Sequence, residues 1–171
     1  MPIRPIVKYG ESVLHAPSRP VPEIDDSVRA LVADMVATMY AAPGIGLAAP
    51  QVGVPLRVIV IDLSVGEDKK QLIRLVNPEI VEREGEQQHE EGCLSIPGYA
   101  GSPKRPARVV ARGLDLDGKP HTFEATELLA RAFCHEIDHI DGLLFVDRLT
   151  PLKRDLMKRK LRKRAREGWE E

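Results

Sequence analysis

The feature that most constrains this chain is the pentapeptide His135-Glu136-Ile137-Asp138-His139, because it lies inside an apolar run with helical spacing. Neither Gly nor Pro interrupts that run before Gly142, and its apolar members are Leu128, Leu129, Ala132, Phe133, Ile137 and Ile140. On a helix, His135 and His139 are separated by about 6 Å of rise, so both imidazoles point the same way. Two neutral histidines in this H-E-x-x-H pattern can share one metal ion, with Glu136 as general base. By chance the pattern occurs in on the order of one such chain in a few hundred.

Composition describes an ordinary globular chain. Its 171 residues are 43% hydrophobic and 30% charged, which predicts one domain with a substantial core. No apolar run approaches the roughly 18 residues that span a bilayer, and the N-terminal residues lack a signal-peptide core. Two cysteines cannot build a disulfide framework. We therefore expect a cytoplasmic enzyme.

The pattern along the chain changes from helix to strands and back to helix. Residues 1–22 predict an extended arm, and from Ile24 an apolar stripe predicts a helix that is capped by Asp25 or Asp26 and stopped at Pro43-Gly44. Short β-branched runs follow, then a weaker polar pair, then a hairpin: 57–62, 71–77, 80–84 with 86–90, and 109–116 with 121–124. Strands followed by a buried helix predict an α+β fold with mostly antiparallel strands.

Basic residues gather at the C-terminal end. Residues 149–171 hold 9 of the 25 Lys and Arg but only 4 of the 26 Asp and Glu. Pro151 favours a helix start, and a narrow apolar stripe is formed by Leu152, Leu156, Met157 and Leu161. We divide the chain into a catalytic domain, 1–149, and a basic helical tail, 150–171. The tail is either a solvated helix packed along the body or an electrostatic contact for RNA phosphates.

Residues 44–53 form a loop rich in Gly and Ala. The spacing of Gly44, Gly46 and Ala49 is superficially that of a dinucleotide fingerprint, but a helix precedes the loop and Pro50 blocks a following one. Small residues let a ligand or another backbone approach closely. The loop is therefore either a tight connection or a wall of a binding site, and only the second explains Gln51 at its centre.

Cys93 is the obvious third ligand for a metal bound by the two histidines. Two histidines and one cysteine with a free fourth position form a catalytic arrangement, whereas a structural site fills that position with protein. Cys134 lies about 100° round the helix from His135, which leaves His89 as the only plausible fourth protein ligand. The alternative for Cys93 is a small buried apolar residue.

Three segments in order, GIGLAAPQVG at 44–53, EGCLS at 91–95 and HEIDH at 135–139, resemble the three signature motifs of peptide deformylases. The resemblance implies antiparallel sheets around a central H-E-x-x-H helix, with a basic C-terminal helix. It implies that Cys93, His135 and His139 hold the metal and that Glu136 is the acid/base. It makes Gln51 and the backbone N–H of Leu94 the donors to the oxyanion.

The same resemblance implies the substrate, the cofactor and the partners. The enzyme would remove the formyl group from formyl-methionine of nascent polypeptides and release formate. One divalent ion is implied, Fe2+ in the cell with Zn2+ or Ni2+ in preparations, and the tail would contact the ribosome near its exit tunnel. The substrate site would be formed by Ile45, Gly46, Glu91, Leu128, Leu129 and Ala132. Core packing explains the last three equally well.

Two other classes of function remain from the residues alone. An H-E-x-x-H peptidase commonly takes a further Glu or His ligand downstream, for which the candidates are Glu167, Glu170 and Glu171. A ribosome- or RNA-binding module with a structural metal is the other.

Overall fold

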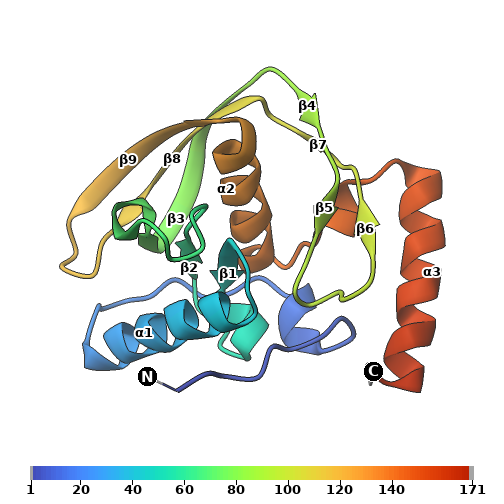
Figure 1. Cartoon of the computed structure of the whole chain (residues 1–171), viewed down its shortest axis with the longest axis horizontal. Coiled ribbons are helices and arrows are strands. Elements are labelled where there is room, and N and C mark those ends of the chain that lie inside the picture. The colour runs from blue at the N-terminus through green and yellow to red at the C-terminus, as the bar shows by residue number, and fades with distance from the viewer. Residues whose placement is uncertain (1, 170–171) are drawn as a thin grey trace.

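The computed structural model describes residues 2–169 and has an α+β fold built on one antiparallel sheet. The sheet has five strands in the order β1-β2-β3-β8-β9, and each neighbouring pair is antiparallel (Figure 1). The strands are β1 (Gly46–Ala48), β2 (Val58–Ile61), β3 (Ile73–Glu84), β8 (Arg108–Leu114) and β9 (Pro120–Thr126). The predicted fold class and the predicted hairpin of β8 and β9 are confirmed.

Helices cover both faces of the sheet because β2 is apolar at every position. Ile59 and Ile61 pack in the cluster of α2 (Glu127–Ile140), whereas Val58 and Val60 pack in that of α1 (Asp26–Ala41). Successive side chains of a strand point to opposite faces, so a fully buried strand requires a layer on each side. The H-E-x-x-H helix α2 is therefore central, as predicted, and Figure 1 shows it between β3 and the strands β5 and β6.

The predicted pairing of 80–84 with 86–90 is wrong. Residues 71–77 and 80–84 belong mostly to one long strand, β3, which pairs with β8 across two register shifts. Asn77 adopts φ 52 beside Pro78, and its side chain exchanges two hydrogen bonds with the backbone of Val21. A bulge stabilised in this way lets the strand continue past a proline that reads as a break in the sequence.

Between β3 and β8 the chain makes an excursion that carries part of the site. It forms two short antiparallel pairs, β4 (Gln87–Gln88) with β7 (Lys104–Arg105) and β5 (Glu91–Gly92) with β6 (Ala100–Gly101). Only two of the residues 86–90 are thus in a strand, and their partner is β7. Short 3-10 turns complete the described chain: η1 (Ser12–His15), η2 (Ala49–Val52), η3 (Lys69–Gln71) and η4 (Phe145–Arg148).

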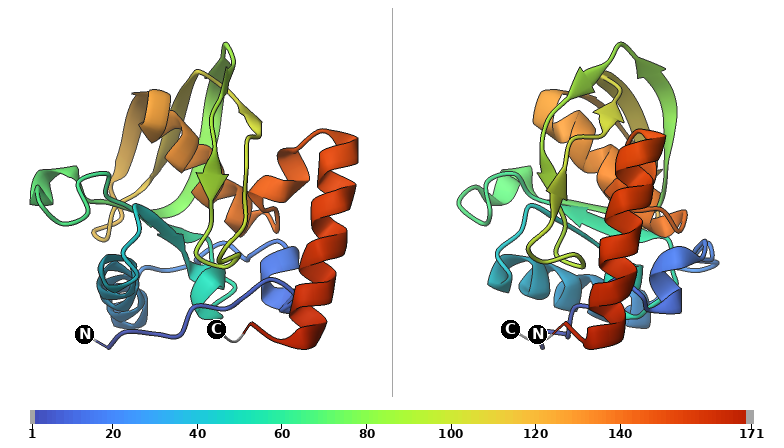
Figure 2. Two further views of the ribbon diagram at one scale, coloured as in Figure 1. Left: turned by 45° about the vertical axis from the view of Figure 1, so that its right-hand side comes forward. Right: turned by 90° about the vertical axis from the view of Figure 1, so that its right-hand side faces the viewer.

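The C-terminal helix α3 (Pro151–Glu167) begins at Pro151 as predicted and stands along one edge of the molecule (Figure 2). The predicted apolar stripe is only partly correct, because Leu152 and Leu156 are 72% and 48% exposed whereas Leu161 is fully buried. Leu161 and Met157 pack in a third apolar cluster with Tyr9, Ile96 and Phe145. Within residues 2–169, no helix is both long and apolar enough to cross a membrane.

Candidate active site

Three side chains that could bind a metal converge from two segments far apart in the sequence. His135 and His139 lie one turn apart on α2, and Cys93 follows β5. Their nearest ligand atoms all lie within 4.8 Å of one another, and Cys93 Sγ is 3.4 Å from His139 Nε2. Metal–sulfur and metal–nitrogen bonds of about 2.3 and 2.0 Å at a tetrahedral angle place the two atoms about 3.5 Å apart. The spacing therefore fits one shared ion.

Among residues 2–169, no fourth His, Cys, Asp or Glu joins this cluster. His89 is exposed, and Cys134 is buried in the core beneath α2, where burial raises the pKa of its thiol to about 11. Glu167 lies at the end of α3 beside Lys163, while Glu170 and Glu171 lie outside the described residues. Within residues 2–169, the further ligand of the peptidase alternative is thus not found, and one side of the cluster is left for water or substrate.

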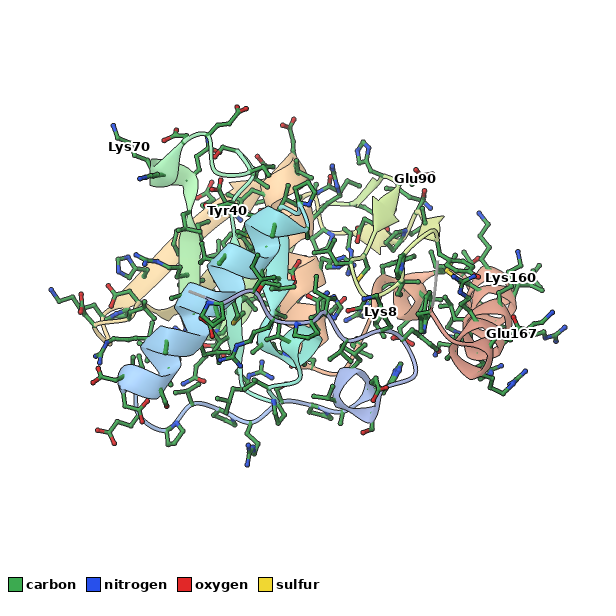
Figure 3. All side chains as sticks on the ribbon, turned by 60° about the horizontal axis from the view of Figure 1, so that its bottom comes forward. Lys8, Tyr40, Lys70, Glu90, Lys160 and Glu167 are labelled. Carbon is green, nitrogen blue, oxygen red and sulfur yellow. The ribbon has the colours of Figure 1, made fainter. Side chains whose placement is uncertain are left out.

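A cavity of about 440 Å³ opens onto Cys93 and His135, whereas His139 is fully buried and does not line it. One wall is formed by residues 43–46 with Gln51, the second by residues 90–94, and the third by the face of α2 that carries Leu128, Arg131, Ala132, His135 and Glu136. Figure 3 shows the labelled Glu90 on the β4–β5 side of this site. Leu129 does not line the cavity and instead packs against the core under α2. Leu129 lies about 100° round the helix from Leu128 and nearly in line with the buried Glu136, at the edge of the face that lines the cavity.

The carboxylate of Glu136 is buried at the base of this cavity. Its Oε1 atom has no hydrogen-bond partner within the described residues, and burial raises the pKa of Glu136 to about 7. Gly46 in β1 passes directly over it, since a Cβ atom on Gly46 would lie 2.5 Å from Glu136 Oε2. Burial also lowers the pKa of His139 well below its usual value, which favours the neutral imidazole that binds metals.

Gln51 presents its amide nitrogen to the same cluster. The backbone N–H of Ala48 donates to Gln51 Oε1 at 3.0 Å, which fixes the orientation of the amide. Gln51 Nε2 then lies 3.2 Å from Ser95 Oγ and 3.7 Å from Cys93 Sγ. Leu94 borders the cavity, and its N–H donates to no acceptor within residues 2–169. The Gln51 amide nitrogen thus lies beside Cys93, the candidate ligand, and Leu94 is the next residue in the chain.

Comparison with known proteins identifies the family. The model of the polypeptide deformylase family matches residues 3–155. A peptide deformylase from Acidobacterium capsulatum is 52% identical over 168 residues, covering 98% of this chain and 99% of that protein. This chain belongs to the polypeptide deformylase family. It is therefore a hydrolase of the N-formyl amide of nascent polypeptides, as the three motifs predicted.

Solved deformylase structures share the whole fold. A structure from Legionella pneumophila is 48% identical with a TM-score of 0.87, and the match covers 94% of each chain. A structure from Synechococcus elongatus in complex with actinonin is 41% identical with a TM-score of 0.86, covering 94% of this chain and 90% of that one.

Behind the candidate metal ligands of this deformylase lies an ion-pair network that sequence reasoning missed, with Arg105, Glu91 and Asp138 as its buried members. Arg105 donates to both carboxylate oxygens of Glu91 at 2.9 and 3.0 Å and to Asp138 Oδ2 at 2.7 Å. Arg148 also donates to Asp138, at 3.0 and 3.2 Å. Neither arginine belongs to a motif, and only the tertiary fold brings them to the helix.

Glu91 connects this network to a ligand. His135 Nδ1 lies 3.1 Å from Glu91 Oε1, which leaves Nε2 to face Cys93. Burial alone would raise the pKa of Glu91, but hydrogen bonds from His135 and Arg105 outweigh it and lower that pKa to about 2. Glu91 borders the cavity, yet its carboxylate faces Arg105 and His135. The contacts of Glu91 therefore favour a role in orienting His135 over the predicted contact with substrate.

Replacing Gly46 by Ala tests the close approach of β1 to Glu136. The new methyl group would displace the carboxylate, and a shift of about 1 Å lowers turnover on the order of a hundredfold. We expect this loss in formate release with metal content unchanged. Gly92→Ala is the matched control, because its Cβ would meet only the Tyr99 carbonyl oxygen at 3.9 Å. Equal activity of the Gly46 variant and the wild type would contradict the proposed crowding.

Replacing Glu91 by Gln tests the support of His135. Loss of the charge weakens the hold on His135 Nδ1 and leaves Arg105 with one carboxylate partner, so we expect metal affinity to fall about ten- to a hundredfold. Competition with a chelator measures this affinity. The neighbouring exposed Glu90→Gln provides the control. If both variants retain metal equally, Glu91 does not support the ligand.

Proposed function

We propose that this chain removes the formyl group from formyl-methionine at the start of nascent polypeptides, with one divalent ion held by Cys93, His135 and His139. The observation that carries the proposal is the convergence of these three donors beside the buried carboxylate of Glu136, at the base of a cavity. Two ligands of the imidazole type and one thiolate, with a fourth position free, match a catalytic site.

Glu136 is the group that moves protons in this proposal. When bound, a divalent ion acidifies a water molecule and polarises the formyl oxygen. Glu136 takes the proton of the attacking water and later delivers it to the leaving amine. Burial raises the pKa of the Glu136 carboxyl, which makes its carboxylate a stronger base than an exposed one and suits it to accept the proton of water.

Gln51 and Leu94 stabilise the tetrahedral oxyanion. The Gln51 amide is pre-oriented by Ala48 and lies beside Cys93, and the N–H of Leu94 is free within the described chain. Donors fixed in advance need no reorganisation when charge develops on the substrate oxygen. Losing one such donor costs roughly a hundred- to a thousandfold in rate.

The edge of the sheet binds the peptide. β1 is hydrogen-bonded to β2 on one side only, so the Ile45–Gly46 segment offers its other edge to an extended substrate backbone. Leu128 and Ala132 line the cavity from α2 and form the apolar wall for the methionine side chain. The volume of the cavity, about 440 Å³, is sufficient for the methionine side chain and the formyl group.

The donor set favours a metal that accepts thiolate and imidazole together. Fe2+, Zn2+ and Ni2+ all do so, and we propose Fe2+ in the cell with Zn2+ or Ni2+ in preparations. Metal analysis of anaerobically prepared protein, combined with formate release from a formyl-Met peptide, tests both the activity and the ion.

Substitution of Glu136 separates metal binding from proton transfer. We expect Glu136→Ala to retain the metal and to lose at least a hundredfold in formate release, because the other carboxylates in the cavity walls cannot replace it. Glu91 is held by Arg105 and His135, and Glu90 is exposed. Cys93→Ala, His135→Ala and His139→Ala should lose the metal itself. Metal analysis and formate assays on the same samples distinguish these results, and full turnover by Glu136→Ala would remove its proposed role.

The basic helix α3 is proposed as the contact with ribosomal RNA near the exit tunnel, with the protein acting in the cytoplasm. Its exposed cations include Lys153, Arg159 and Lys160, and Figure 3 shows Lys160 at the end of the molecule farthest from α1. A row of exposed Lys and Arg side chains binds phosphates through the release of counterions. Deleting all of α3 would not test ribosome binding alone, because it would also remove Leu161 from the core.

Changing charge without changing packing tests the ribosome contact. We expect the triple variant Lys153→Gln, Arg159→Gln and Lys160→Gln to bind ribosomes more weakly and with a shallower dependence on salt, since about three phosphate contacts are lost. Hydrolysis of a short formyl peptide should be unaltered. The exposed pair Lys69→Gln and Lys70→Gln on η3 is the control. Unchanged, salt-insensitive ribosome affinity in the triple variant would refute the proposal.

A further inference from the structure

The N-terminal arm lies across the back of both loops that carry the oxyanion donors. The N–H of Val7 donates to the carbonyl oxygen of Gln51 at 2.7 Å, and the N–H of Tyr9 donates to that of Ser95 at 2.9 Å. Gln51 and Ser95 are the two residues whose side chains meet at 3.2 Å beside Cys93. The arm is therefore hydrogen-bonded to the main chain of both Gln51 and Ser95.

Trp169, just beyond α3, fixes the arm from the other side. Its Nε1–H donates to the carbonyl oxygen of Tyr9 at 2.9 Å, so Tyr9 is held by Trp169 on one side and by Ser95 on the other. The indole ring also packs edge-on against Tyr99, at 6.2 Å between centroids. Tyr99 belongs to the same turn as Cys93 and Ser95.

The junction between the arm and α3 has no spare space. Gly10 adopts φ +107, and a Cβ atom there would lie 2.9 Å from Cβ of Ala165. Tyr9 is 8% exposed, and its cluster contains the fully buried Ile96 and Leu161 together with Cys93. Interiors packed at this density transmit small displacements instead of absorbing them. In Figure 3 the labelled Lys8 marks this part of the arm, between the body and α3.

We propose that Trp169 is a positioning residue for the oxyanion site, acting through Tyr9 and the arm on Ser95 and Gln51. The inference rests on the proposed function, in which Gln51 Nε2 donates to the oxyanion. Such donors must lie about 2.7–3.1 Å from the developing charge, so a displacement of a few tenths of an ångström matters. In the plainer alternative, Trp169 only anchors α3 and contributes stability.

Trp169→Phe keeps the aromatic packing and removes the N–H donor, and Trp169→Ala removes both. With nickel-loaded enzyme and a formyl-Met peptide, we expect Trp169→Phe to lower kcat about three- to tenfold and Trp169→Ala to lower it further. KM and metal content should be unchanged. Amide hydrogen exchange at Val7 and Tyr9 should become faster, with or without added metal. Leu152→Ala on the same helix, at a site 72% exposed, should change none of these quantities.

A double-mutant cycle separates positioning from stability. In a Gln51→Ala background, Trp169→Phe should lower kcat no further, because the group it positions is gone. The same loss factor in both backgrounds, or a lower Tm with wild-type kcat, would overturn the inference. A wild-type enzyme that releases no formate would instead refute the proposed function, which distinguishes the two failures.

Discussion

The candidate site depends on one buried guanidinium. Arg105 is 3% exposed and joins Glu91, two residues before Cys93, to Asp138, one residue before His139. Two carboxylates without a cation between them would repel each other in a dry interior, and a lone buried charge costs several kcal/mol. Because Arg105 meets both, it ties the loop after β5 to α2 through side chains alone. This link joins the two segments whose candidate donors, Cys93, His135 and His139, lie within 4.8 Å of one another.

A second constraint is that, in the proposed function, Glu136 must be dry while the bound ion stays accessible to substrate. The backbone of β1 achieves the first condition, because Gly46 allows the sheet edge to lie against Glu136 without a side chain between them. The cavity achieves the second by opening between β1, the β5 loop and α2. A single glycine therefore serves both the close packing that raises the pKa of Glu136 and the free strand edge proposed to bind peptide.

The sequence predicted those parts of the fold and site that depend on local periodicity and on contiguous motifs. The α2 helix, the hairpin of β8 and β9 and the start of α3 follow from patterns within one segment. Leu128 and Leu129 were predicted together because both are apolar, but only Leu128 lines the cavity, since the packing of α2 in the fold decides where each side chain lies. The single strand β3 was read as two because Pro78 resembles a break, whereas Val21, far away in sequence, stabilises the bulge. Arg105 carried no local signal at all, since its partners lie 14 and 33 residues away.

The difference between local patterns and tertiary contacts also explains why α3 cannot be treated as a detachable tail. Its composition is dominated by cations, so the sequence suggests a separate electrostatic element, but one turn of it buries Leu161 against the residues that support the Cys93 loop. One face of α3 exposes cations and the other anchors the helix through Leu161. A partner can bind the first face without disturbing the second only if the helix is rigid. The ion pair of Lys158 with Asp147 at 2.6 Å, and the close approach of Gly10 to Ala165, hold the second half of the helix against the body. Whatever binds the basic face of α3 therefore acts on a helix that is already part of the core behind the site.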